Sequence, residues 1–173
     1  IVLLTLLWSL KAGVKPGLSL HLLGATVFTL SFGPHLAFVG LSLVVLGITL
    51  NGAAGYFSFA INALLMAGVG VTISQAVHRL VLSFLPRHFF IYVFINGFLG
   101  AFLAVFGVGI TATCLLAMAG AYEWDYLVSE YLSYLILIGF SEAWLSGMLI
   151  TLFVIYRPGW VVTFDDSIYL ANK

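Results

Sequence analysis

The sequence predicts an all-α fold, a polytopic transmembrane helical bundle with about six spans. Hydrophobic residues make up 63% of the 173 residues and charged residues only 7%, whereas about a quarter of an ordinary soluble domain is charged. No Asp, Glu, Lys or Arg lies between Lys15 and Arg79, or between Arg87 and Glu123. Since a spanning helix needs roughly 20 apolar residues, these gaps hold several spans. The runs are continuously apolar rather than alternating, which excludes a membrane β-barrel.

The residues that interrupt the apolar runs divide them into six segments. Lys11 and the turn-forming pair Pro16-Gly17 follow the first segment, Gly33-Pro34 follows the second, and Asn51-Gly52 follows the third. Proline and glycine tend to end helices, and charged residues tend to lie outside the hydrocarbon core of the membrane. The predicted segments cover residues 1–10, about 18–32, about 35–50, about 56–77, 89 to about 121, and about 127–156.

Segment length leaves alternatives open. Residues 18–32 and 35–50 are short for full spans, so they form short helices or a re-entrant hairpin. Residues 89–121 and 127–156 are long, and we expect tilt, a kink or an extension beyond the bilayer. The sequence opens inside an apolar run at Ile1 rather than at Met. We therefore expect that it lacks its true N-terminus, which leaves room for a seventh span in the full-length protein.

We predict one transmembrane domain over residues 1–158, followed by a short cytoplasmic tail at 159–173. Cytoplasmic loops carry an excess of Lys and Arg. If every segment crosses, one side receives four basic residues, and the other receives two together with three acids. This distribution places the C-terminus in the cytoplasm. The two sets are Arg79, Arg87, Arg157 and Lys173 on the inner side, and Lys11, Lys15, Glu123, Asp125 and Glu130 on the outer side.

Composition also excludes several function classes. The net charge is zero and no Lys or Arg cluster occurs, which argues against a nucleic-acid partner. The single Cys114 allows no internal disulfide and no Cys-based structural zinc site. No nucleophile, phosphate loop or dinucleotide motif is recognisable, so the sequence does not predict an enzyme.

Polar side chains within lipid are costly and point to function. His21 opens an apolar helix, and its imidazole is either a ligand for a metal such as Ni, Cu or Zn or a hydrogen-bonded packing group. Asn62 and Met66 are four residues apart and face one side of a helix; the amide bonds a neighbouring helix or lies near a ligand. His78 and His88 flank the basic linker, where we expect both to be solvated.

Glu142 is the one acid deep in the predicted membrane region. It lies 15 residues before Arg157, about 22 Å along a helix. An unpaired carboxylate at that depth is protonated or paired. Glu142 is therefore either part of a proton relay or a pin that bonds Asn62, Ser58 or a backbone amide.

Several stretches together resemble the CbiM-type metal-specific membrane components of energy-coupling factor ABC transporters, which import cobalt or nickel. The order and spacing of these stretches carry the resemblance, which spans most of the chain. They are residues 17–25 (GLSLHLLGA), 32–34 (FGP), 59–66 (FAINALLM) and 139–147 (GFSEAWLSG), running on to Arg157-Pro158.

The resemblance implies a metal site near the outer face, held by an N-terminal Met-His and by a histidine that corresponds to His21, with Asn62 close by. This sequence has no Met-His start. The resemblance further implies Ni or Co as transported substrate, no firm cofactor, and a coupling transmembrane protein with ATPase subunits as partners. A bacterial cell inner membrane is the implied location. The alternative is an accessory or structural subunit of another membrane complex that has lost transport.

Overall fold

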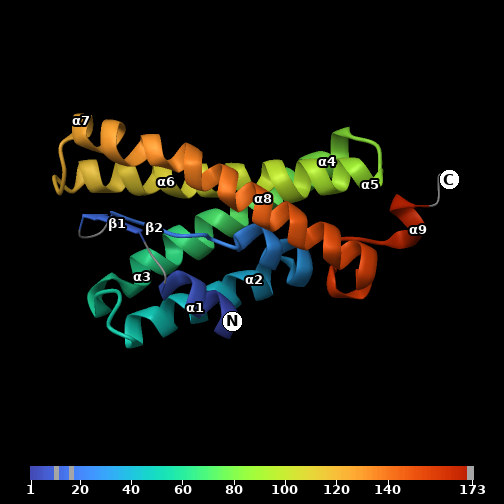
Figure 1. The fold of residues 1–173 in the computed structure, drawn as a ribbon, viewed down its shortest axis with the longest axis horizontal. Coiled ribbons are helices and arrows are strands. Elements are labelled where there is room, and N and C mark those ends of the chain that lie inside the picture. The colour runs from blue at the N-terminus through green and yellow to red at the C-terminus, as the bar shows by residue number, and fades with distance from the viewer. Residues whose placement is uncertain (10–11, 16–17, 171–173) are drawn as a thin grey trace.

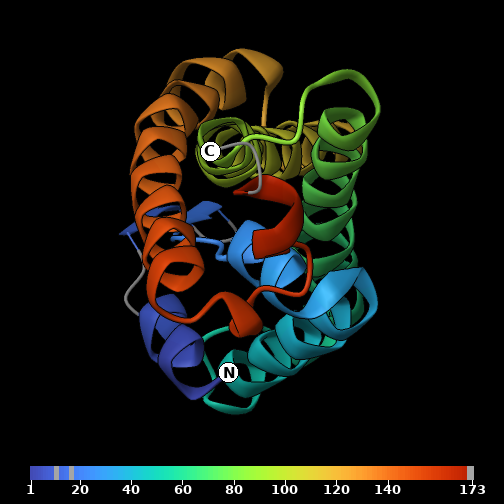
Figure 2. The same ribbon diagram turned by 90° about the vertical axis from the view of Figure 1, so that its right-hand side faces the viewer.

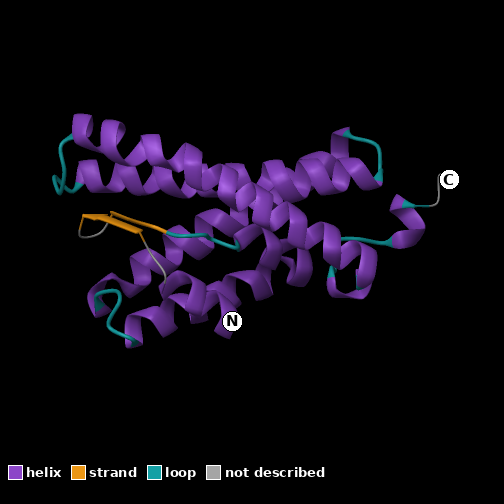
Figure 3. Ribbon diagram, in the orientation of Figure 1, coloured by secondary structure: helices purple, strands orange, loops and turns teal. Residues whose placement is uncertain are grey.

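Helices form most of the chain (Figure 3), and the computed structural model describes residues 1–9, 12–15 and 18–170. Four helices are long and apolar enough to cross a membrane, which confirms the predicted all-α transmembrane bundle. These four are Ala25–Leu50, Tyr56–Phe84, Phe89–Met118 and Trp124–Tyr156.

Three of the four long helices are built from shorter regular pieces, of which the α-helical ones are labelled in Figure 1. Three of the four contain a π-helical stretch, where the turn is wider than in an α-helix. The α-helices and strands are α1 (Val2–Ser9), β1 (Ala12–Lys15), β2 (Leu18–Leu20), α2 (Ala25–Leu50), α3 (Phe59–Asn62), α4 (Gly70–Phe84), α5 (Phe89–Ile91), α6 (Gly100–Met118), α7 (Trp124–Tyr126), α8 (Ser133–Tyr156) and α9 (Asp166–Tyr169). The π-helical stretches are Ala63–Val69, Tyr92–Leu99 and Leu127–Leu132, and 3₁₀ turns cover Tyr56–Ser58 and Pro158–Trp160.

The six predicted segments correspond to four long helices because the first three differ from a simple span. The first segment forms α1, whose eight residues extend only about 12 Å. The second begins as the short strand β2, paired antiparallel with β1, and its remainder joins the third segment within α2. The last three segments each form one long helix.

A sharp bend at Gly33 divides α2 into two arms, a first arm of residues 25–32 and a second arm of residues 34–50. Gly33 has φ 78° and ψ 164°, a conformation that is essentially restricted to glycine. Pro34 follows and can open a helix because it needs no N–H partner there. The arms fold toward each other, since a Cβ on Gly40 would lie 3.1 Å from the Phe28 ring. The two short predicted segments thus form one helical hairpin.

The first arm lies in the centre of the bundle, surrounded by the other helices (Figure 2). Its Leu30 is fully buried, as are Leu41 and Val44 of the second arm. Close approach of helices elsewhere relies on small residues: a Cβ on Gly97 would lie 3.4 Å from the Cα of Gly147. A Cβ on Gly109 would overlap Leu135.

The chain after α8 folds back across one end of the bundle (Figure 2). Val161, Phe164 and Tyr169 are buried there. The backbone N–H groups of Val162 and Thr163 donate to the carbonyls of Ser31 and Leu30, each at 3.2 Å. The predicted tail at 159–173, which is described as far as residue 170, therefore closes the end of the first arm.

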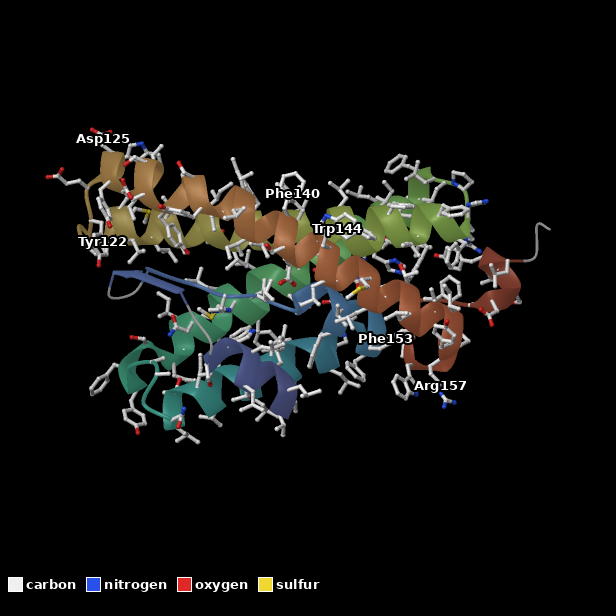
Figure 4. All side chains as sticks on the ribbon, viewed as in Figure 1. Tyr122, Asp125, Phe140, Trp144, Phe153 and Arg157 are labelled. Atoms are coloured by element: carbon white, nitrogen blue, oxygen red, sulfur yellow. The ribbon has the colours of Figure 1, made fainter. Side chains whose placement is uncertain are left out.

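Opposite ends of the bundle differ in charge. Tyr122 and Asp125 lie at one end and Arg157 lies at the other (Figure 4). Arg87, in the linker between α4 and α5, shares the end of Arg157. We call the end with Asp125 the acidic end and the end with Arg87 and Arg157 the basic end. The β1–β2 hairpin lies near the acidic end (Figure 1).

Candidate functional site

Residues 21–24 form an extended segment that runs from the β1–β2 hairpin into the bundle, where α2 begins (Figure 1). Gly24 ends this segment in the left-handed conformation, with φ 69° and ψ 4°. A side chain at Gly24 would be strained, and its Cβ would lie 3.0 Å from Leu4 Cδ1. Glycine at this position therefore lets α1 pack against the start of α2.

His21 lies on this segment and is half-buried. Its ring lies against that of Trp8 of α1, with centroids 4.4 Å apart and planes 36° apart. Nδ1 lies 3.2 Å from the carbonyl oxygen of Leu22. Since a carbonyl only accepts, that hydrogen bond is made by the tautomer with the proton on Nδ1. Imidazole is a common ligand of transition metals.

A cavity of about 50 Å³ lies beside His21, between the second, third and fourth long helices. Met66 and Tyr131 also line it, and apolar side chains such as Leu135 and Ile138 complete the wall. That space suits an ion with a few water molecules and is much smaller than a pocket for a drug-sized ligand. The cavity joins an imidazole with a thioether, both of which are donors to transition metals.

Asn62 is half-buried on α3 and does not line this cavity. Met66, four residues later, does line it. The two side chains part because the helix becomes π-helical from Ala63. Residues four apart are no longer stacked on one face in the wider π turn.

Glu142 is buried in α8, with 1% of its surface exposed. Its Oε2 accepts a hydrogen bond from the Leu23 backbone N–H, and its Oε1 accepts one from the Gly24 N–H, each at 2.7 Å. The Ser146 hydroxyl donates to Oε1 at 3.1 Å. The structure thus joins Glu142 to the segment that carries His21, and it does so through backbone amides rather than through Asn62 or Ser58.

The start of the first arm has a second anchor. The hydroxyls of Thr26 and Ser74, both buried, lie 2.7 Å apart and share a hydrogen bond between α2 and α4. Two other helices therefore hold different parts of this stretch: α8 bonds residues 23 and 24 through Glu142, and α4 bonds residue 26 through Ser74.

His78 corrects the expectation that both linker histidines are solvated. His88 is exposed, but His78 is 5% exposed because α4 continues to Phe84 and turns this residue toward the bundle. Its ring meets Tyr92 edge-on, with centroids 6.2 Å apart. The side chain of the buried Asn96 interacts with that of His78.

At the basic end, Thr163 joins the returning chain to the first arm. Its hydroxyl donates to the Leu30 carbonyl at 2.9 Å, so the Tyr92 hydroxyl, 2.6 Å away, must donate to Thr163. Tyr169 packs beside Tyr92, with ring centroids 5.0 Å apart. Burial raises the pKa of Tyr169, and the nearby positive charge of Arg87 partly opposes the increase.

Sequence reasoning missed three features of this region. Trp8 lies in an apolar run that gives no indication of a contact with His21. Tyr131 lies among aromatic residues of the kind that gather at a membrane–water interface, which gives no indication that it lines a cavity. Ser146 lies one helical turn after Glu142 and was open to prediction from that spacing. Within residues 1–9, 12–15 and 18–170, no three His, Cys, Asp or Glu side chains gather closely enough to hold a metal ion. His21 is the one residue of these types that lines the cavity.

Comparison with known proteins adds two findings. A family model described as the cobalt uptake substrate-specific transmembrane region, CbiM, matches residues 1–160. The crystal structure of a truncated transition metal transporter superposes with a TM-score of 0.79 at 16% sequence identity, covering 90% of this chain and 77% of that one. That similarity establishes the shared fold. No curated protein matches the sequence.

Proposed function

The chain belongs to the CbiM family, the substrate-specific transmembrane regions of cobalt uptake, and we propose that it captures Co²⁺ or Ni²⁺ for an energy-coupling factor importer. Membership makes it a membrane component of metal uptake. The observation that carries the finer proposal is the placement of His21: its half-buried imidazole lines the cavity within the bundle. Neutral imidazole suits Co²⁺ and Ni²⁺.

We propose His21 as one ligand of the transported ion, and one imidazole does not hold a metal tightly. Further donors are required, and the family resemblance implies that an N-terminal Met-His supplies them. Asn62 is proposed to lie near the ion only after rearrangement, because its side chain does not line the cavity. Met66 is the better placed neighbour, although its soft thioether suits Co²⁺ and Ni²⁺ less well than imidazole does.

The charges support a direction of uptake. The basic end, with Arg87 and Arg157, is the cytoplasmic end by the excess of Lys and Arg. Residues 21–24 then enter from the acidic, outer end. We propose a bacterial inner membrane location with the C-terminus inside. Reorientation of the bundle would be driven by a coupling membrane protein and ATPase subunits that dock at the basic end.

Metal analysis of the full-length protein tests the proposal. After purification in detergent with Co²⁺ or Ni²⁺ present, the unchanged protein should retain metal, and His21→Ala should lose most of it. His88→Ala is the matched control, because His88 is an exposed histidine at the basic end and should retain metal fully. Equal retention by His21→Ala and the unchanged protein would remove His21 from the site. No retention by the unchanged protein would favour the accessory-subunit alternative.

A further inference from the structure

Residues 21–24 have little local structure of their own to hold them. They are extended, they lie between a two-stranded hairpin and a helix, and they include a left-handed glycine. In such a segment the backbone N–H groups have no ladder or helix partner, and burial without a partner is costly. Leu23 is 3% exposed, so its N–H has little access to water. An acceptor from elsewhere in the fold is needed.

Glu142 is that acceptor, and its geometry is specific. Each carboxylate oxygen takes one of the two successive N–H groups, Leu23 to Oε2 and Gly24 to Oε1, both at 2.7 Å. Hydrogen bonds of this length to a carboxylate are charge-assisted. Two bonds to two atoms fix the orientation of the segment as well as its position. Ser146 in turn fixes the carboxylate through Oε1.

His21 depends on this anchor because it lies only two residues before Leu23. The contacts of its ring described above are the one with Trp8 and the hydrogen bond to the neighbouring Leu22 carbonyl. Leu22 belongs to the anchored segment, so this hydrogen bond moves with residues 23 and 24. A shift of the Leu23 and Gly24 amides would therefore change the direction of the imidazole.

We propose that Glu142 is the positioning residue of metal capture: without touching the ion, its carboxylate holds residues 22–24 so that the His21 imidazole lines the cavity. This inference rests on the proposed function of His21. It gives the buried acid a task other than a proton relay. Replacing a residue that orients a metal ligand typically lowers metal affinity about 10- to 100-fold.

Glu142→Gln tests the two hydrogen bonds to the backbone most directly. Glutamine has the same length, but its NH₂ group cannot accept, so one of the two backbone N–H groups must face a donor. Thr26→Val is the matched control. It removes the hydrogen bond to Ser74 next to the same segment and leaves the amides of Leu23 and Gly24 in place.

Two measurements on the full-length protein in detergent test the inference. Hydrogen–deuterium exchange of peptides that cover residues 22–24 reports the anchor without any metal, and calorimetric titration with Co²⁺ or Ni²⁺ alone reports affinity. In Glu142→Gln we expect faster exchange at residues 22–24 and an affinity reduced about 10- to 100-fold. Thr26→Val should lose thermal stability and keep the unchanged protein's affinity within about threefold.

Each contrary result has its own meaning. Unchanged exchange, or unchanged affinity, in Glu142→Gln would overturn the positioning role. An equal loss of affinity in Thr26→Val would overturn it as well, because general loosening of the first arm would then explain both variants. Absence of binding by the unchanged protein would instead reject the proposed function, and the exchange experiment would still decide whether Glu142 holds the segment.

Discussion

The two ends of the first arm of α2 are held by opposite chemistry. At its start, the N–H groups of Leu23 and Gly24 donate to the carboxylate of Glu142, deep inside the bundle. At its end, the carbonyls of Leu30 and Ser31 accept from the chain that returns after α8. We call these the acid-held end and the backbone-held end.

The difference follows from what each end of a helix presents. A helix start exposes donors and carries partial positive charge, so it favours an anion. A helix end exposes acceptors, which neutral N–H and hydroxyl groups can satisfy. The buried start is held here by a buried acid, whereas the equally buried end is satisfied by another piece of backbone. The acid-held end is therefore the less replaceable of the two.

The largest expected effect comes from removing the carboxylate that holds the acid-held end. Glu142→Ala leaves the Leu23 and Gly24 amides and the Ser146 hydroxyl without their acceptor, and each buried unsatisfied group costs about 1–3 kcal/mol. We expect a loss of at least about 3 kcal/mol, measured by thermal unfolding in detergent. Glu130→Ala, an exposed acid on the same long helix, should change stability little. Equal effects of the two substitutions would contradict the comparison.

The second test removes the bend that separates the two arms. Gly33→Ala meets no atom within 4 Å, so its cost is backbone strain alone. We expect a loss of about 1–3 kcal/mol in unfolding measurements. Gly68→Ala is the matched substitution, because its Cβ would make only an ordinary contact with Phe38 at 3.8 Å. Gly68→Ala should be neutral or stabilising by up to about 1 kcal/mol; destabilisation of both variants to the same extent would argue against a special conformation at Gly33.

The third test weakens the backbone-held end. Thr163→Val removes the hydroxyl that bonds the Leu30 carbonyl and accepts from Tyr92. We expect a loss of about 1–2 kcal/mol, clearly less than for Glu142→Ala, because two backbone bonds remain. Thr151→Val removes a hydroxyl that bonds only the Gly147 carbonyl of its own helix, and it should cost less. If Thr163→Val lowered the free energy of unfolding as much as Glu142→Ala does, the acid-held end would not be the less replaceable one.

The smallest effect concerns the short helix α9, which follows the backbone-held end. The side chain of Asp165 accepts hydrogen bonds from the N–H and the hydroxyl of Ser167, and these hold its pKa below the ordinary value of 3.8. A lowered pKa in the folded state means that this capping is fully present above the unfolded-state pKa and is lost as the pH falls through the folded value. The Ser167 amide resonance should titrate with a midpoint below 3.8. Asp165→Asn should abolish that titration, and a midpoint at or above 3.8 would contradict the capping role.

Parts of this fold were open to prediction because they depend on local composition. The charge-free gaps between Lys15 and Arg79 and between Arg87 and Glu123 predicted apolar spans, and three of the four long helices begin within them. The Gly33-Pro34 pair predicted an interruption, which the structure places as the bend inside α2. The number of spans was less accessible, because a segment of about 16 apolar residues fits a short span or one arm of a hairpin equally well.

For the site, the sequence pointed to individual polar residues but not to the contacts between them. His21 and Glu142 stand out in the sequence because polar side chains are rare in such runs. Their relation does not, because 118 residues separate Gly24 from Glu142. His78 was expected in solvent beside Arg79, but a helix turns successive residues about 100° apart, and only the packing decides which of the two faces inward.

Composition and spacing were enough to identify a helical membrane protein, the interruptions of its helices, and His21 and Glu142 as polar groups within its apolar runs, since these follow from the cost of placing polar groups in lipid. Packing decided that α2 folds into two arms, that His78 faces inward, and that Glu142 holds the backbone beside His21. It also decided that the chain after α8 closes the opposite end. Hydrogen bonds between distant segments depend on where each backbone is placed, and that placement is a property of the packed bundle rather than of any local stretch.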